Sequence, residues 1–173
     1  MKNLAGYIRN IPDFPVKGIQ FKDITTLLKN GELFAEAVDH LYDPFRETEI
    51  NKVVAIEARG LIFGAALAYK LNAGFIPIRK PGKLPAEVVR EEYELEYGKD
   101  SLEIHRDAIE EGDKIIIVDD LLATGGTAKA CCQLVEKLNG DIVGLSFLIE
   151  LTELNGRKLL KGYNVYSLIS FPF

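Results

Sequence analysis

The chain has 173 residues, of which 47% are hydrophobic, and a formal net charge of −5 at pH 7. This length and apolar content predict one domain with a sizeable core. The acidic balance argues against a nucleic-acid-binding surface, and no run is long and apolar enough to indicate a membrane span. Residues 1–14 lack the apolar core of a secretion signal, and only two cysteines occur, so we expect a cytoplasmic protein.

The N-terminal segment, residues 1–28, is predicted to form an arm against the rest of the domain. A short helix is expected over residues 2–9. Two prolines and a glycine then interrupt residues 11–24, which excludes a continuous helix or a central strand there. The interrupted segment still carries Phe14 and Phe21, so it either covers the core or closes over a flat apolar ligand, with Phe21 as a stacking surface.

Strands and helices alternate after the arm. Apolar residues at three- and four-residue spacing, or small residues after a strand, predict helices over residues 31–42, 61–71 and 128–138. Apolar runs predict strands over residues 52–56, 75–80, 115–118 and 141–149, and alternation predicts an edge strand over residues 163–170. This order predicts an α/β fold: a single domain with a mainly parallel twisted sheet flanked by helices.

Residues 86–106 break this pattern. Apolar and charged residues alternate with a period of two on both sides of residues 98–101, which predicts an antiparallel hairpin with its turn at those four residues. An insertion between strands of a parallel sheet should project beyond the sheet. We therefore expect a lid that closes and excludes water.

The most informative stretch is residues 115–128, IIIVDDLLATGGTA. A buried strand leads into Asp119 and Asp120 and then into a loop of small residues, Ala123, Thr124, Gly125, Gly126 and Thr127. The loop lacks the lysine of a nucleoside-triphosphate loop and the spaced glycines of a dinucleotide fold. Paired acids suit sugar hydroxyls or a hydrated Mg²⁺, and the loop can surround one terminal phosphate with donors. A ribose carrying a 5-phosphate is the predicted ligand.

Two further strand ends carry candidate anion-binding residues. Ala58, Arg59 and Gly60 follow the strand at residues 52–56, where a glycine lets the backbone approach a ligand closely. Arg79, Lys80 and Lys83 follow the next strand of an otherwise acidic chain. The basic cluster is either a solvated loop or a diphosphate site, and its place at a strand end favours the diphosphate.

Six motifs together resemble the adenine phosphoribosyltransferases, of the type I phosphoribosyltransferase family, over essentially the whole chain: DFPVKGIQFKDIT, EARGLIFG, IRKPGKLP, EYELEYGKDSLEIH, VDDLLATGGTA and LIELTELNGR. The resemblance implies the family fold with an N-terminal hood arm (residues 1–28) and an inserted, flexible catalytic hairpin (residues 86–106). It also implies transfer of the phosphoribosyl group from phosphoribosyl diphosphate (PRPP) to N9 of adenine. The products would be AMP and diphosphate, in purine salvage, with Mg²⁺ and a homodimer.

The resemblance also implies roles for individual residues. The ribose and 5-phosphate would bind to Asp119, Asp120, Ala123, Thr124, Gly125, Gly126 and Thr127, with the two acids holding Mg²⁺ through water or PRPP. The diphosphate would bind to Ala58, Arg59, Gly60, Arg79, Lys80 and Lys83. A cis peptide would join Ala58 to Arg59, and Arg79 would reach across a dimer interface.

The remaining implied roles concern the base. Adenine would be enclosed by Gln20, Phe21, Lys22, Arg59 and Leu151. Glu96 would transfer a proton, with Tyr97 and Arg59 as the other catalytic residues. Relatives often carry Ser in place of Ala58 and Arg in place of Lys22, which leaves the side-chain contacts at these two positions open.

Three alternatives stay open on the sequence. One is a phosphoribosyltransferase for a 6-oxopurine (hypoxanthine, guanine or xanthine); such enzymes use a lysine near the C-terminus, whereas Lys158 and Lys161 lie in a plain basic turn. Another is a regulator that senses PRPP or purines and binds DNA, which the net charge disfavours. The third, a protein with a dead site, conflicts with the joint presence of both acids, the glycines and Glu96.

Overall fold

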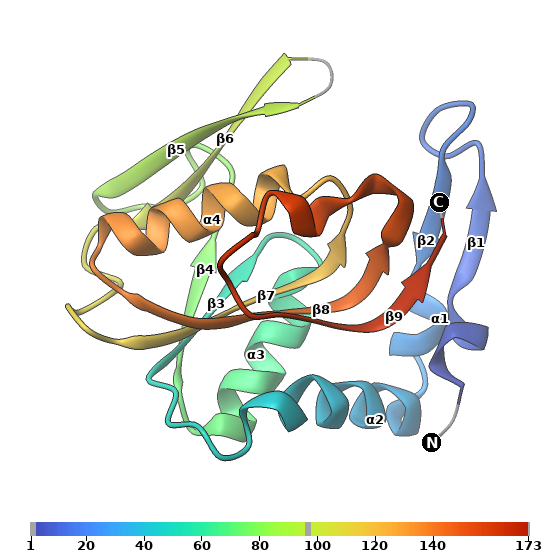
Figure 1. Ribbon diagram of the computed structural model, residues 1–173, viewed down its shortest axis with the longest axis horizontal. Helices are drawn as coiled ribbons and strands as arrows, with labels where there is room; N and C mark the ends of the chain where they lie inside the picture. The colour runs from blue at the N-terminus through green and yellow to red at the C-terminus, as the bar shows by residue number, and fades with distance from the viewer. Residues whose placement is uncertain (1–2, 96–97, 173) are drawn as a thin grey trace.

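A five-stranded parallel sheet forms the centre of the computed structural model, which describes residues 3–95 and 98–172. Its strands lie in the order β4-β3-β7-β8-β9 (Figure 1). They are β3 (Lys52–Ile56), β4 (Gly74–Ile78), β7 (Lys114–Leu122), β8 (Asp141–Leu151) and β9 (Val165–Phe171). These strands have continuous apolar runs because helices cover both faces of the sheet, so that few strand positions face the solvent. The predicted fold class is confirmed.

Helices cover both faces of the sheet (Figure 1). Helices α2 (Gly31–Tyr42) and α3 (Gly60–Leu71) lie on one face, and α4 (Gly126–Lys137) lies on the other. Helix α2 has the predicted bounds because Asn30 caps it: the Asn30 side chain accepts hydrogen bonds from two N–H groups of the first turn. Short elements complete the chain: η1 (Leu4–Tyr7), α1 (Thr25–Leu28), η2 (Asp43–Phe45), η3 (Thr152–Leu154) and η4 (Gly156–Lys158).

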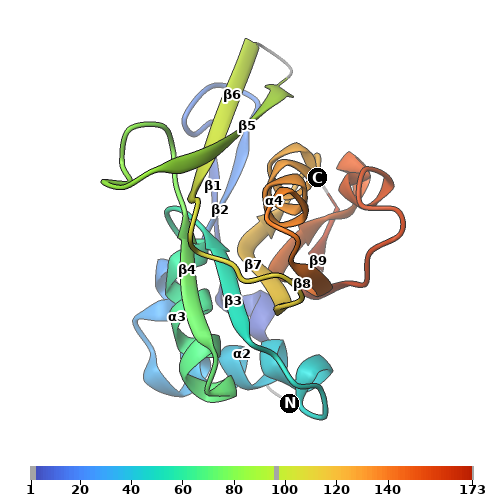
Figure 2. The same cartoon turned by 90° about the vertical axis from the view of Figure 1, so that its left-hand side faces the viewer.

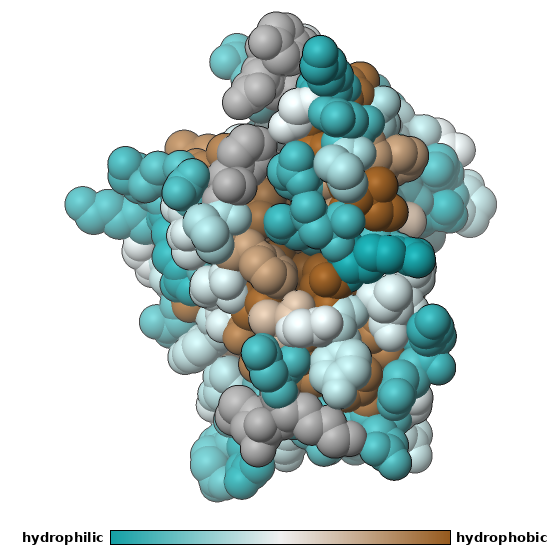
Figure 3. Space-filling view, turned by 90° about the vertical axis from the view of Figure 1, so that its right-hand side faces the viewer, coloured by the Kyte–Doolittle hydropathy of each residue, from teal (hydrophilic) through white to brown (hydrophobic). Residues whose placement is uncertain are grey.

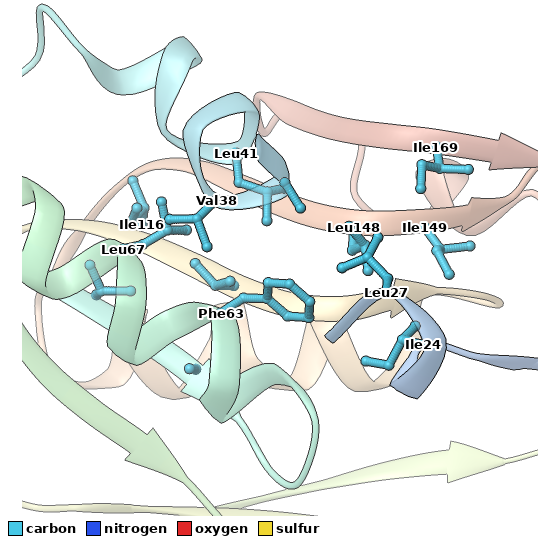
Figure 4. Packing of buried hydrophobic residues seen from close by; sticks show 14 of the residues in the cluster. Ile24, Leu27, Val38, Leu41, Phe63, Leu67, Ile116, Leu148, Ile149 and Ile169 are labelled. Atoms are coloured by element: carbon cyan, nitrogen blue, oxygen red, sulfur yellow. The ribbon is translucent and has the colours of Figure 1, made fainter. Parts of the chain in front are cut away.

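The core has two layers, one on each side of the sheet. Figure 4 shows the layer in which Phe63 and Leu67 of α3 meet Val38 and Leu41 of α2 over the sheet. In the other layer, α4 packs with its buried cysteines against the opposite side of the same strands. This double cover fixes the positions of the strand ends, where the candidate site lies.

The N-terminal arm is a small antiparallel hairpin of β1 (Arg9–Pro12) and β2 (Gln20–Asp23), set beside the sheet (Figures 1 and 2). The predicted short helix over residues 2–9 is confirmed only in part: a 3-10 helix, η1, covers Leu4–Tyr7 and ends before Arg9. The physical reason is that Arg9 pairs with Asp23 as the first residue of β1. Arg9 Nε also donates a hydrogen bond to Asp23 Oδ2 at 2.9 Å. Apolar surface lies across the middle of this side of the molecule (Figure 3).

The predicted antiparallel hairpin consists of β5 (Val88–Leu95) and β6 (Gly98–His105), which project beyond the central sheet (Figure 2). Leu102 and Ile104 anchor its base in the core. The predicted turn at residues 98–101 is wrong: Gly98 pairs with Leu95, and residues 99–101 continue the ladder down to Glu92. The return strand begins at Gly98, which has a positive φ, four residues earlier than the alternation indicated.

Strands β4, β7, β8 and β9 differ in their bounds from the prediction, and the differences at β4 and β7 bear on the candidate site. Strand β4 ends at Ile78, so the basic cluster follows the strand entirely. Strand β7 continues to Leu122 because Leu122 still pairs with Glu150 of β8, which places both acids inside the strand. Among the residues described, no helix is long and apolar enough to cross a membrane.

Candidate active site

A cleft of about 400 Å³ opens at the carboxyl ends of β3 and β7, between the sheet and the hairpin. Six of the predicted ribose- and phosphate-binding residues line it: Asp119, Asp120, Ala123, Thr124, Gly125 and Thr127. Parallel strands deliver their carboxyl ends to the same edge, so residues that are far apart in sequence meet there. The cleft is therefore the candidate active site.

The phosphate loop, residues 123–127, joins β7 to α4. Gly125 has a φ of +87° and forms the N-cap of α4, a conformation that favours glycine. Gly126 is the first residue of the helix, whose first-turn N–H groups have no partner within the helix. Free N–H groups and the positive end of the helix dipole point the same way, so the loop is suited to a phosphate.

The two acids form a close pair beside this loop. The Asp120 N–H donates to Asp119 Oδ1 at 2.8 Å. Burial raises the pKa of both carboxyls, and the Asp120 charge raises that of Asp119 further. Across the cleft, Arg59 Nη2 lies 2.8 Å from Asp120 Oδ2 and lowers the pKa of Asp120 in opposition to burial. The geometry of this ion pair leaves Asp120 Oδ2 without an aligned hydrogen bond within residues 3–95 and 98–172.

The acid pair is chemically suited to Mg²⁺. This ion keeps several waters and usually takes one or two protein carboxylates together with substrate oxygens. The buried Asp120 Oδ2, which lacks an aligned hydrogen bond and lies 2.8 Å from Arg59 Nη2, has the chemistry of such a carboxylate oxygen. Within the described residues no group of three or more His, Cys, Asp and Glu side chains is arranged to hold a metal, so the pair would need substrate or water oxygens to complete the shell.

The turn after β3 brings the second predicted anion-binding segment against the acids. Ala58 and Arg59 line the cleft, and a Cβ placed on Gly60 would lie 2.6 Å from Asp119 Oδ1. The cis peptide expected between Ala58 and Arg59 is wrong, since it joins Glu57 to Ala58. Arg59 itself already has helical dihedral angles, as the N-cap of α3, so the cis bond lies one residue before the predicted position.

The basic cluster is organised by Glu57, a residue that the sequence analysis did not single out. The Glu57 carboxylate accepts from Arg79 Nε at 2.9 Å and from the Lys80 N–H at 2.8 Å, and Lys83 Nζ lies 3.4 Å away. Burial raises the pKa of Glu57, but these hydrogen bonds and the Lys83 charge leave it below its ordinary value. Arg79 and Lys83 thus surround a carboxylate at the cleft wall. The available signal was the position of Glu57 directly after the apolar run of a strand, like that of Asp119 after residues 115–118.

Lys80 is the member of the cluster that lines the cleft. Its ammonium is paired with Asp100 and donates to Tyr93 Oη at 3.0 Å, both on the hairpin. Its hydrogen bond lowers the pKa of Asp100. Tyr93 and Asp100 were also missed; they pair directly across the hairpin, which only the correct turn position could have revealed.

Arg59 connects the cleft to the N-terminal arm. Its Nη1 donates to the Lys22 carbonyl at 3.1 Å, and its guanidinium carbon lies 4.9 Å from the centre of the Phe21 ring. Gln20 accepts from the Asn10 side chain at 2.6 Å, on the same hairpin. Leu151 is buried at the end of β8, outside the lining of the cleft. Among the five residues predicted to enclose adenine, Arg59 is the one in the lining of the cleft, and it also contacts Phe21 and Lys22 of the arm. The predicted catalytic residues Glu96 and Tyr97 lie outside the described residues.

Comparison with known proteins agrees with this geometry. The phosphoribosyl transferase domain model matches residues 23–171. The adenine phosphoribosyltransferase of Halothermothrix orenii is 60% identical over 96% of this chain and 98% of its own length. The chain belongs to the adenine phosphoribosyltransferase family.

Solved structures from this family share the fold closely. The crystal structure of the adenine phosphoribosyltransferase from Thermoanaerobacter pseudethanolicus has a TM-score of 0.95 at 55% identity, covering 97% of this chain and 98% of that one. The Saccharomyces cerevisiae enzyme, solved with an imino-altritol bisphosphate and adenine, has a TM-score of 0.90 at 42% identity, covering 95% and 96%. Family membership thus extends through the arm, the hairpin and the cleft.

Proposed function

We propose that this protein transfers the 5-phosphoribosyl group of PRPP to N9 of adenine, giving AMP and diphosphate, as in purine salvage. The observation that carries the proposal is the cleft in which the acid pair and the phosphate loop face Arg59 and Lys80. These groups match the three parts of PRPP: ribose hydroxyls, 5-phosphate and diphosphate. The choice of adenine is supported by relatives that are 56–60% identical and carry the name adenine phosphoribosyltransferase.

The reaction replaces one bond at C1 of the ribose with another. The bond from C1 to the diphosphate oxygen breaks and the bond from N9 to C1 forms, while the N9 proton leaves. Positive charge builds on the ribose ring and negative charge on the leaving group. Asp119 and Asp120 hold the ribose hydroxyls and offset the positive charge, and Lys80 and Arg59 stabilise the diphosphate as it leaves.

Mg²⁺, bound through the acid pair and PRPP oxygens, would neutralise part of the diphosphate charge. The diphosphate also has the Ala58–Arg59–Gly60 turn as a backbone contact, beside the acids. Arg79 and Lys83 supply further positive charge close to the cleft, because both are ion-paired with Glu57 in its wall. The proposed metal and diphosphate sites therefore share one wall of the cleft.

The base site is proposed between the arm and the hairpin. Phe21 offers a ring for stacking, and the backbone near Gln20 and Lys22 can read the edge of adenine. Leu151 contributes an apolar wall at the end of β8. Glu96 is proposed to take the N9 proton, because it supplies a carboxylate in the inserted segment, residues 86–106, that is predicted to close over the base.

A homodimer is also proposed. Ile62 and Tyr69 lie two turns apart on α3, and Phe75 lies on the edge strand β4; all three are exposed, Tyr69 by 90%. Exposed apolar side chains on α3 and on the edge strand are suited to contact with a second copy. Light scattering should give twice the monomer mass of 19.3 kDa, and a particle of 19.3 kDa would contradict the proposal. The cytoplasmic location stays a prediction.

The test of function is nucleotide formation from PRPP and MgCl₂ with adenine, hypoxanthine, guanine or xanthine in separate reactions. Adenine should be preferred in kcat/KM by at least about 10²-fold, since a polar pocket built for the amino group leaves its donors or acceptors unpaired against a 6-oxo group. Preference for a 6-oxopurine would favour the alternative enzyme. DNA binding at physiological salt without nucleotide formation would favour a regulator.

A further inference from the structure

The turn after β8 touches the phosphate loop through Gly156. A Cβ placed on Gly125 would lie 2.5 Å from the Gly156 carbonyl oxygen. A Cβ placed on Gly156 would overlap the Ala123 carbonyl oxygen and lie 3.1 Å from Gly125 N. The two segments therefore meet backbone to backbone, with no room for a side chain on either glycine.

The two glycines are needed for different reasons. Gly125 has a φ of +87°, so its backbone conformation favours glycine whatever surrounds it. Gly156 lies outside that φ range and belongs to the helical turn η4, where alanine has no backbone penalty. What excludes a side chain at Gly156 is the close approach of the phosphate loop, together with the Leu122 side chain.

Arg157, the next residue, holds this turn in place. Its Nε and Nη2 bind both oxygens of Glu150 at 2.7–3.0 Å. Nη2 also donates to Ser167 Oγ at 2.8 Å, and Nη1 donates to the Val165 carbonyl at 2.7 Å. Hydrogen bonds from Arg157 lower the pKa of Glu150 in spite of its burial. One guanidinium thus ties the turn to both β8 and β9.

The turn and the phosphate loop also start from neighbouring points. Leu122, the last residue of β7, pairs with Glu150 of β8. The loop leaves β7 directly after Leu122, and the turn leaves β8 one residue after Glu150. A displacement of the turn would therefore also displace the phosphate loop, because the two segments touch at Gly156 and Gly125.

We propose that Gly156 and Arg157 are positioning residues for the 5-phosphate of the substrate, acting through the phosphate loop. The proposal rests on the proposed function. The loop binds phosphate only if its N–H groups converge on one point, and displacing such donors by part of an ångström costs binding energy. Gly156 sets how closely the loop can sit against β8, and Arg157 keeps Gly156 at that distance.

The test compares Gly156→Ala with Gly31→Ala, a control at a helix start where an added Cβ meets nothing within 4 Å. The probes are ribose 5-phosphate, which reaches the loop, and inorganic pyrophosphate, which reaches the opposite wall of the cleft. Gly156→Ala should raise the dissociation constant of ribose 5-phosphate by about 10-fold or more, and that of pyrophosphate by less than about 2-fold. Gly31→Ala should change neither constant.

A second variant serves if Gly156→Ala does not fold. Arg157→Lys keeps the charge but loses the two-pronged hydrogen bonding of the guanidinium to Glu150. It should raise the dissociation constant of ribose 5-phosphate about 3-fold and leave that of pyrophosphate nearly unchanged. Equal weakening of both probes, or no weakening by either variant, overturns the positioning role. If the unmodified protein binds neither probe, the proposed function itself fails.

Discussion

Arg59 Nη2 lies 2.8 Å from Asp120 Oδ2, which links the turn after β3 to the strand that carries the acid pair. The same guanidinium donates to the Lys22 carbonyl and packs on the Phe21 ring. One planar cation therefore connects the acid pair, which is proposed to bind the ribose, with the arm that is proposed to enclose the base.

Replacing Arg59 tests this connection. Arg59→Lys should lower kcat/KM by about 10-fold or more, because an ammonium cannot bind the carboxylate, the carbonyl and the ring together. Steady-state kinetics with PRPP and adenine varied in turn will measure it. Arg46→Lys is the matched control, because Arg46 follows η2 and makes an exposed ion pair with Asp43. A kcat/KM within about twofold of the unmodified protein in Arg59→Lys would remove the proposed role.

Asp119→Asn should separate stability from binding. Burial and the Asp120 charge raise the pKa of Asp119 in the folded protein, so its ionised form destabilises the fold. This loss of folding stability is absent below pH 3.8, the ordinary pKa of an aspartate. It grows as the pH rises from there through the raised pKa of Asp119 in the folded protein. At neutral pH the variant should therefore melt higher, by an amount on the order of 2–4 °C for each kcal/mol gained, while PRPP binding is lost.

Calorimetry at several pH values measures this effect. The gain in Tm of Asp119→Asn over the unmodified protein should shrink as the pH falls toward 3.8. The hydrogen bond from the Asp120 N–H survives, because Asn keeps an acceptor oxygen at that position. A variant that melts lower at neutral pH would show that the ionised acid stabilises the ligand-free fold.

The fold was largely predictable because its signals are local. The apolar run at β3 and the three- and four-residue apolar spacing of α2 predicted the bounds of these elements correctly. The acids and the loop at residues 123–127 line one cleft, as expected of residues that are contiguous in the chain, and their roles stay predictions. Glu57, Tyr93 and Asp100 were missed because their roles depend on partners brought together only by the fold. Periodicity likewise could not distinguish a turn at Gly98 from the ladder that continues there.

Asp100 is expected to compete with the diphosphate for Lys80. The ammonium of Lys80 is paired with Asp100, and under the proposed function it would have to exchange this partner for the leaving group. Asp100→Asn should therefore tighten pyrophosphate about 2- to 5-fold, the range expected for losing a partly exposed ion pair. Isothermal titration will measure it, with Asp39→Asn on the Lys70 pair as control. Weaker pyrophosphate binding in Asp100→Asn would mean that Asp100 orients Lys80 for the ligand.

Glu96→Gln tests the proposed proton transfer. The amide cannot accept the N9 proton, so kcat should fall by about 10²–10⁴, with a much smaller change in the KM for adenine. Glu94→Gln, an exposed position on the same hairpin, is the control. The role is lost if kcat of Glu96→Gln stays within a factor of about two.

A competition reaction tests the central claim most directly. The protein is incubated with PRPP, MgCl₂ and equal concentrations of adenine and hypoxanthine, and the nucleotides are separated by chromatography at low conversion. AMP should exceed IMP by at least about 10²-fold, and the Asp119→Asn protein should form neither. Equal amounts of the two nucleotides, or an excess of IMP, would contradict adenine phosphoribosyl transfer as the function of this cleft.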